Sequence, residues 1–536
     1  MIPKNTVLTA TPVGSESELT RNLLSGIDVQ TANVYTGSSS YVEHIPEESV
    51  DITIGVFMDG TLNNRGNSNA RMAYEKAINP IHIPLTESEQ EYHNFRRDTP
   101  AGERGSYEND HSNVARMEPA YKKITSGKQL QDRVYIEGIG SVTGGRDDED
   151  GMGLGEGPTG VPKKVEKACI DAARKANALL SNSNVEKINM LQIDVFGFSR
   201  GAAAARNFVH ELTRRIGDER TVFDGDDEAE GDAKDGENYE VDYGEFGVQL
   251  GSEVVAKIRR FVVRFVGLYE TVASYGMVHY NDTGDLNLDA IKTPDKDDPN
   301  RSIYNTRHVF QLVAQDEHRE NFVITNIDSA NGVEKFIPGV HSDIGGSYTD
   351  NAKEVDSEGN DLIIKEPSAW SWNDRENAEA MRTQLINESW YRPNELLIDD
   401  DDNLRVHRTV VSKKYSFIPL HIMAEYAMKK KLLFEFSKIG NKYDLSETAS
   451  VVLSGGINYS TDLQSIKNRL DKHVYEEQEP MSLVNSDDEK MLRLIRTNYI
   501  HTSAHYSNQI KIKGIWYAPH QPHDSYLTRE REENDG

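Results

Sequence analysis

The chain has 536 residues, and its 60 basic and 88 acidic side chains give a formal net charge of −28. A protein this acidic repels nucleic acid and gains no electrostatic attraction to anionic lipid, so nucleic-acid binding is not expected. Cys169 is the single cysteine, which excludes an intramolecular disulfide. No run approaches the roughly 18 apolar residues of a transmembrane helix, and the N-terminus lacks the apolar core of a Sec signal peptide. The chain is therefore expected to be made in the cytoplasm without a signal peptide.

Strands and helices alternate along the first two thirds of the chain. Residues 1–48 are polar and rich in Ser and Thr, and they predict an N-terminal arm. The predicted strands are 51–59, 132–141, 187–201, 257–272 and 332–348, and the predicted helices between them are 161–180 and 202–216. This alternation predicts an α/β fold with a mostly parallel sheet flanked by helices, in a catalytic core over 49–350.

Acidic segments interrupt this core near 218–246 and 293–302, and we interpret them as solvated surface insertions. The composition then changes, and 351–536 is predicted to be a mainly helical C-terminal region for a lid, for membrane docking or for partner docking. Its helix over 418–436 has an apolar stripe. Packing of that stripe onto the core is favoured over a lipid-facing lid helix, which remains the alternative.

The first strand ends in "VFMDGTLNN", and Asp59-Gly60-Thr61 within it matches the centre of the haloacid-dehalogenase phosphatase signature, Asp-x-Asp-Gly-Thr. In that signature the nucleophilic aspartate stands two residues before the second one, where this chain has Phe57. A phenylalanine neither attacks phosphorus nor binds magnesium. The loop therefore has another purpose.

The sequence Gly197-Phe198-Ser199-Arg200-Gly201 is a G-x-S-x-G motif between an apolar strand and an alanine-rich helix. That context predicts a nucleophile elbow, in which a strained turn presents the serine hydroxyl above the sheet. The backbone N–H of Arg200 then faces the same point and serves as one oxyanion donor. A serine in a glycine-rich packing turn is the alternative.

A hydrolase of this kind needs an acid and then a histidine after the serine. Glu270 ends the fourth predicted strand, and His341 stands in a glycine-containing loop after the fifth. These residues complete a predicted Ser199–Glu270–His341 triad. Asp343 is the rival acid, but it lies two residues from the histidine and is expected to brace the loop instead.

Six segments together carry a resemblance to a known family. They are "VFMDGTLNN", "GFSRGAAAAR", "FVGLYETVAS", "AQDEHRENF", "PGVHSDIGGSY" and "YIHTSAHY". In this order they resemble the bacterial α/β-hydrolases that contain the type VI secretion phospholipase effectors of the first lipase class, over roughly residues 50–350 with an echo near 499–506. The resemblance implies a phospholipase A1 or A2, an antibacterial toxin delivered into a competitor's periplasm. It also implies a phospholipid membrane as substrate, an immunity partner, and a spike or adaptor protein for loading.

Within that interpretation the nucleophile is Ser199 and the base is His341. The family usually has Trp-Asp-Thr-Val where this chain has Tyr-Glu-Thr-Val, so the identity of the acid as Glu270 is open. Gly60 is expected to supply the second oxyanion donor, while Asp59 and Thr61 fix the turn. No cofactor is expected. His501 and His505 have the spacing of half a zinc site, but no third ligand is evident, and packing is favoured.

Two further functions fit the same residues. One is a serine esterase that acts on a soluble ester, and the other is a non-catalytic interaction protein that uses the hydrolase fold as a scaffold.

Overall fold

A computed structural model describes most of the chain. The described residues are 45–78, 87–99, 105–221, 238–275, 282–288, 306–330, 332–356, 358–367, 374–507, 510–512, 515–523 and 531–535. Nearly all of the predicted arm, the insertion at 293–302 and residues 222–237 of the other insertion lie outside them. Everything described below belongs to one compact unit, Val50–Gly536, apart from the first residue of the first strand.

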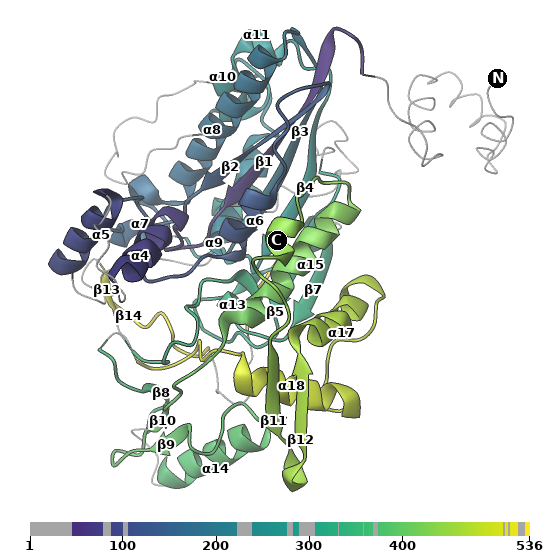
Figure 1. Ribbon diagram of the computed structural model, residues 1–536. Helices are drawn as coiled ribbons and strands as arrows, with labels where there is room; N and C mark the ends of the chain where they lie inside the picture. Colours follow the sequence, from purple (N-terminus) through teal and green to yellow (C-terminus); the bar gives the residue numbers. More distant parts are fainter. Residues whose placement is uncertain are drawn as a thin grey trace, which may run out of the picture. The chain divides into compact units, whose positions relative to one another are not determined.

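A six-stranded sheet is the centre of this unit, in the order β2-β1-β3-β4-β5-β7 (Figure 1). Its strands are β1 (Ser49–Met58), β2 (Gln129–Ile136), β3 (Lys187–Phe198), β4 (Phe261–Tyr269), β5 (Val309–Ala314) and β7 (Val333–Ile337). The pairs β1–β2, β3–β4, β4–β5 and β5–β7 are parallel. This confirms the predicted α/β fold, and each predicted strand is present. The sequence analysis missed β5, a six-residue apolar run beside an acidic segment.

One face of the sheet is covered by helices α8 (Val161–Asn182), α9 (Arg200–Glu211) and α10 (Gly244–Leu250). Side chains alternate along β1, so Ile54, Val56 and Met58 enter this layer while Phe57 points to the other face. In α8 a proline stands in the first turn, where the helix needs no N–H from it, and alanines let the helix lie close to the sheet.

The opposite face is covered by α6 (Asn113–Met117) and α15 (Phe417–Lys429), and Figure 1 shows α15 lying over β4 and β5. Its Tyr426 stacks on Phe310 of β5 with ring centroids 3.9 Å apart. Ile418, Ile422 and Met423 are fully buried. The apolar stripe of this helix is thus core packing, and the lid alternative does not describe it.

The remaining elements surround this core. The other helices are α4 (Arg65–Ile78), α5 (Glu87–Asp98), α7 (Glu149–Leu154), α11 (Ser252–Val255), α12 (Asp282–Asp285), α13 (His341–Gly345), α14 (Asp374–Asn387), α16 (Ser437–Gly440), α17 (Leu463–Tyr475) and α18 (Ser486–Asn498). The other strands are β6 (Ile324–Thr325), β8 (Leu362–Lys365), β9 (Leu396–Ile398), β10 (Leu404–Val406), β11 (Thr448–Val452), β12 (Asn458–Asp462), β13 (Ile510–Ile512), β14 (Ile515–Tyr517) and β15 (Glu533–Asn534).

Within 351–536 the predicted helices are present as α14, α15 and α18, accompanied by small sheets that the sequence pattern did not reveal. Buried side chains of this region and of the central sheet belong to one apolar cluster. Across the described ranges, no helix has the length and apolar character needed to cross a membrane.

Candidate active site

Ser199 stands at the sharp turn between β3 and α9, which is the strand–turn–helix context of a nucleophile elbow. Its backbone is strained, with φ 57° and ψ −132°, a combination that non-glycine residues rarely adopt. A Cβ added at Gly201 would lie 2.1 Å from the carbonyl oxygen of Asp59, so the turn packs directly on the loop that follows β1. The strained geometry places the serine at the carboxyl edge of the sheet, where α/β proteins bind ligands.

Glu270 and His341 meet at the same edge. Glu270 directly follows β4 with φ 53°, and His341 is the first residue of α13, just after β7. His341 Nδ1 lies 3.1 Å from Glu270 Oε2. Because a carboxylate only accepts hydrogen bonds, Nδ1 carries the proton in the neutral ring, which leaves Nε2 as the basic nitrogen.

The residues around the serine connect it to this pair. The Ser199 N–H donates to the carbonyl of Tyr269, the residue before Glu270, at 3.0 Å. The Phe198 ring packs against the His341 imidazole with centroids 4.7 Å apart. A Cβ at Gly345 of α13 would lie 1.9 Å from the Phe198 ring, so glycine permits this close approach. The structure thus brings all three predicted triad residues to one place.

The buried surroundings favour the charge states that a base and its acid need. Burial raises the pKa of Glu270, but the positive charge of Arg531 and the hydrogen bond from His341 outweigh it and hold that pKa below its usual range. Burial lowers the pKa of His341, with Glu270 opposing this in part. At neutral pH the carboxylate is therefore ionised and the imidazole is neutral.

A second buried carboxylate, Glu317, holds the backbone of the histidine loop. Its Oε2 accepts the His341 N–H at 3.1 Å, and its Oε1 accepts the Ser503 hydroxyl at 3.2 Å. Arg319 neutralises it through two hydrogen bonds of 3.0 and 2.9 Å, which hold the pKa of Glu317 well below its usual range against the effect of burial. Glu317 and Arg319 both lie in the segment "AQDEHRENF", which contributed to the family resemblance, but the sequence analysis assigned them no role.

Asp343 lies in the histidine loop and binds elsewhere than His341. Its Oδ2 accepts the Val340 N–H at 3.1 Å and the His501 N–H at 3.2 Å, and its Oδ1 lies 2.7 Å from His501 Nδ1. The His501 ring stacks on Tyr348, with centroids 3.8 Å apart. Asp343 therefore connects the start of α13 to the segment after α18.

The two histidines with zinc-site spacing point to different partners. His505 stacks on His520 with centroids 4.4 Å apart, while His501 is bound to Asp343. Within the residues that the structure describes, there is no group of three or more His, Cys, Asp or Glu side chains that could hold a metal ion.

The loop after β1 lies beside the serine turn. The Gly60 N–H donates to Asp59 Oδ1 at 2.8 Å, so an oxyanion would compete with this carboxylate for the predicted donor. The Tyr135 hydroxyl donates to Asp59 Oδ2 at 2.6 Å. Burial raises the pKa of Asp59 to about 6, although hydrogen bonds from Ser112 and Tyr135 oppose the rise. Asp59 thus titrates near the pH at which a histidine base would work.

The Arg200 side chain fastens the serine turn to two loops. Its Nε donates to the Thr61 hydroxyl at 2.8 Å, and its other nitrogens donate to the carbonyls of Gly151 and Met152 in α7. Burial lowers the pKa of Arg200 to about 10, so the guanidinium stays charged at neutral pH. Thr61 therefore acts through its hydroxyl as a partner of Arg200.

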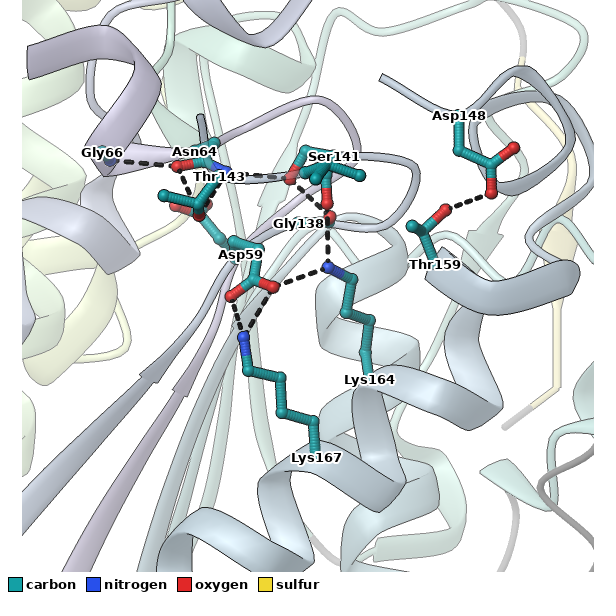
Figure 2. Close-up of polar contacts among 12 residues, drawn as sticks. Asp59, Asn64, Gly66, Gly138, Ser141, Thr143, Asp148, Thr159, Lys164 and Lys167 are labelled. Carbon is teal, nitrogen blue, oxygen red and sulfur yellow. Dashed lines mark hydrogen bonds and ion pairs between the residues drawn. The ribbon is translucent and has the colours of Figure 1, made fainter. Parts of the chain in front are cut away.

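The loops after β1 and β2 are held together by side-chain hydrogen bonds, as Figure 2 shows. Asn64 Nδ2 donates to the Thr143 hydroxyl at 2.9 Å, and Asn64 Oδ1 accepts the Gly66 N–H at 3.0 Å. Lys164, which is buried in α8, donates to the Ser141 carbonyl at 3.1 Å. These bonds join the loop after β1 to the loop after β2 and to α8.

Besides Glu317, sequence reasoning missed the cation that contacts the predicted acid. Arg531, in the described segment 531–535, places Nη1 3.1 Å from Glu270 Oε1 and Nη2 2.9 Å from Glu270 Oε2. Its local sequence, "REREEND", is a run of charges with no structural periodicity. No signal in the sequence connects it to an acid 261 positions away.

Comparisons with known proteins identify a family and two solved structures that the chain resembles. The family model described as "T6SS, Phospholipase effector Tle1-like, catalytic domain" matches residues 97–370. The solved structure of the Tle1 effector bound to the VgrG spike of the type 6 secretion system has a TM-score of 0.53 and 20% sequence identity, and covers 93% of this chain and 97% of that one. An uncharacterized protein from Pseudomonas aeruginosa has a TM-score of 0.32 and 19% identity, and covers 63% and 45%. No curated protein matches the chain.

Proposed function

Because the chain belongs to the family of Tle1-like phospholipase effectors of the type VI secretion system, we propose that it is a serine-dependent phospholipase A with Ser199 as its nucleophile. The observation that carries this proposal is the 3.1 Å contact between His341 Nδ1 and Glu270 Oε2, at the sheet edge where the strained turn presents Ser199. A neutral histidine, oriented by a buried ionised acid beside a serine in an elbow, is the arrangement that acyl-ester hydrolysis requires.

The reaction would proceed in two half-reactions. His341 Nε2 takes the proton of the Ser199 hydroxyl as the oxygen attacks the ester carbonyl of the lipid, and Glu270 stabilises the imidazolium that forms. His341 then returns the proton to the leaving lysophospholipid oxygen, and an acyl-serine remains. In the second half His341 activates water, which releases the fatty acid and restores the serine.

The oxyanion of each tetrahedral intermediate needs backbone donors. The Arg200 N–H at the start of α9 is the first, and it gains from the positive end of that helix dipole. The Gly60 N–H is the second, shared with Asp59 Oδ1. Protonation of Asp59 would weaken the hydrogen bond that holds this donor and would remove the negative charge of that carboxylate.

The biological setting follows from the same family. We propose that the chain is an antibacterial effector delivered into the periplasm of a target cell, where phospholipid acyl esters are accessible. The related solved Tle1 effector is bound to a VgrG spike, which supports a spike or adaptor protein as the loading partner here. A toxin of this kind also requires a cognate immunity protein in the producing cell.

The direct test is product analysis on vesicles of a phospholipid with different sn-1 and sn-2 acyl chains. Wild type is expected to release one of the two fatty acids, and mass spectrometry of the products identifies the A1 or A2 bond. Ser199→Ala is expected to lower the rate by about 10³-fold or more. Ser183→Ala, at the far end of α8, is the matched control and keeps wild-type activity.

Undiminished fatty-acid release by Ser199→Ala would refute the serine mechanism. Labelling of Ser199 by a fluorophosphonate without phospholipid hydrolysis would instead favour a soluble ester as substrate. No labelling at all would favour a non-catalytic interaction protein.

A further inference from the structure

The ionised form of Glu270 is buried and needs a permanent positive charge beside it to be stable. Its side chain is 0% exposed, and its partner His341 is neutral in the resting state. An ionised carboxylate that is fully buried beside a neutral ring is costly, and removing the partner of a buried charge is strongly destabilising. Among the residues that the structure describes, Arg531 is the one permanently charged group in contact with this carboxylate.

The geometry of Arg531 also fixes how the acid is oriented. Its two terminal nitrogens each face one carboxylate oxygen, at 3.1 Å and 2.9 Å, and the Ala314 N–H donates to Oε1. A glutamate has three side-chain torsions that must be fixed before Oε2 can serve His341. The hydrogen bond from Nη1, the ion-pair contact through Nη2 and the backbone N–H together hold the carboxylate plane with Oε2 toward the imidazole.

The segment that carries Arg531 is attached by its own backbone. Strand β15 pairs in parallel with β6, and the Ile324 N–H donates to the Glu532 carbonyl at 3.2 Å. The Asn326 N–H donates to the Asn534 carbonyl at 3.0 Å. The arginine side chain adds one bond of its own, from Nε to the Phe322 carbonyl at 2.5 Å. The backbone pairing of β15 with β6 does not use that side chain, so a substitution at Arg531 leaves the pairing in place.

We propose that Arg531 is the positioning residue of the catalytic acid, which orients Glu270 toward His341 and keeps it ionised in its buried site. This proposal rests on the proposed function only in taking Glu270 as the acid of the triad. Arg531 touches neither the nucleophile nor the substrate. Arg531 Nε also donates to the Phe322 carbonyl at 2.5 Å, and the Phe322 ring packs against His341 with centroids 4.8 Å apart. The test must therefore separate the effect through Glu270 from an effect through Phe322.

The test is a double-mutant cycle on the full chain with Arg531→Met and Glu270→Gln. The readouts are the rate of fluorophosphonate labelling at Ser199, kcat and KM on phospholipid vesicles, and the thermal unfolding midpoint. In the wild-type background Arg531→Met is expected to lower the labelling rate and kcat by about 10- to 100-fold, as supporting residues of functional sites do. KM stays unchanged, because the residue does not contact substrate.

In the Glu270→Gln background the same Arg531→Met change is expected to have no further effect on rate, because the group that Arg531 positions is already neutral. Arg531→Lys keeps the charge without the fork, and we expect it to recover part of the rate. Glu532→Gln, in the same segment but paired with His523 away from the triad, is the matched control and keeps the wild-type rate.

Equal losses from Arg531→Met in both backgrounds would overturn the proposal, as would a wild-type rate in Arg531→Met. If Arg531→Met alone fails to fold, the double variant decides: a rate equal to that of Glu270→Gln supports the proposal, and a lower rate contradicts it. Labelling of Ser199 is independent of the natural substrate. Failure of the wild type to hydrolyse phospholipid would therefore refute the proposed function alone, whereas failure of Ser199 to label would refute both.

Discussion

Two carboxylate–histidine pairs lie in and beside the loop that contains His341. They consist of the same chemical groups but have different neighbours. Glu270 and His341 are 3.1 Å apart, and Asp343 and His501 are 2.7 Å apart. His341 packs against Phe198, the residue before the nucleophile, whereas His501 stacks on Tyr348. The pair with the shorter contact, Asp343 and His501, is thus the one whose histidine does not pack against the residue before the serine. A short carboxylate–imidazole contact does not identify a catalytic pair, and the neighbours of the ring do.

The two histidines should separate most clearly when each is replaced by glutamine. His341→Gln removes the proposed base, and we expect kcat on phospholipid to fall by about 10³-fold or more. His501→Gln removes one buried hydrogen bond, and we expect it to lower the free energy of unfolding by about 1–3 kcal/mol while the folded fraction stays active. Steady-state kinetics below the unfolding transition, together with thermal unfolding, measure both effects.

An inactive but stable His501→Gln would break this comparison and bring the second pair into the reaction. An active His341→Gln would remove the first pair from it.

The two carboxylates give the next largest contrast. Glu270→Gln cannot accept the Nδ1 proton of His341 in the same way and does not stabilise the imidazolium, so we expect kcat to fall by about 10²- to 10⁴-fold. Asp343→Asn keeps one acceptor for the Val340 and His501 N–H groups and is expected mainly to lower stability. Fluorophosphonate labelling at a temperature where both variants are folded compares them directly.

Equal labelling by the two variants would contradict the assignment of Glu270 as the acid.

The pH dependence of kcat/KM also distinguishes the two histidines, and it does so without a large change in rate at neutral pH. The neutral form of His341 is the active one, and burial holds its pKa below the ordinary imidazole value of about 6.5. Nearly all of His341 should therefore be in its active, neutral form at pH 7, and this form is lost as the pH drops through that lowered value. The acid limb of kcat/KM is expected to have its midpoint below about 6.5 in wild type and in His501→Gln alike.

A midpoint that moves in His501→Gln would show that the second pair is coupled to the base.

The two pairs also show which site residues the sequence could predict and which it could not. Ser199 and Glu270 directly follow strands of a parallel sheet, and His341 comes shortly after β7. Parallel strands bring their carboxyl ends to one edge, so spacing and order were enough to predict a triad. The fold followed from the same alternation of strands and helices. Arg531 and His501 reach the site from segments after α18, through contacts that no periodicity records.

The Gly60 N–H also differs from its prediction, because it is already hydrogen-bonded to Asp59. The Gly60 N–H was predicted from the position of its loop alone. Its hydrogen bond to the side chain of the preceding Asp59 depends on the χ1 angle of that aspartate, which a strand pattern does not reveal.

The smallest effect is expected at Ser503, which connects the two pairs through Glu317. Glu317 accepts the backbone N–H of His341 on one oxygen and the Ser503 hydroxyl on the other, and Ser503 lies two residues after His501. Ser503→Ala removes one of several hydrogen bonds to a carboxylate that Arg319 still neutralises. We expect it to lower the free energy of unfolding by about 1 kcal/mol and to leave kcat within about twofold.

Glu317→Gln is the informative companion, because it leaves the Arg319 guanidinium buried without a counter-charge and weakens the hold on the His341 backbone. Its loss of stability should exceed that of Ser503→Ala severalfold in chemical denaturation. If the serine variant instead lost as much as the glutamine variant, the hydroxyl and not the Arg319 pair would be what holds Glu317. The histidine loop would then depend on the segment after α18, and the two carboxylate–histidine pairs would act as one unit.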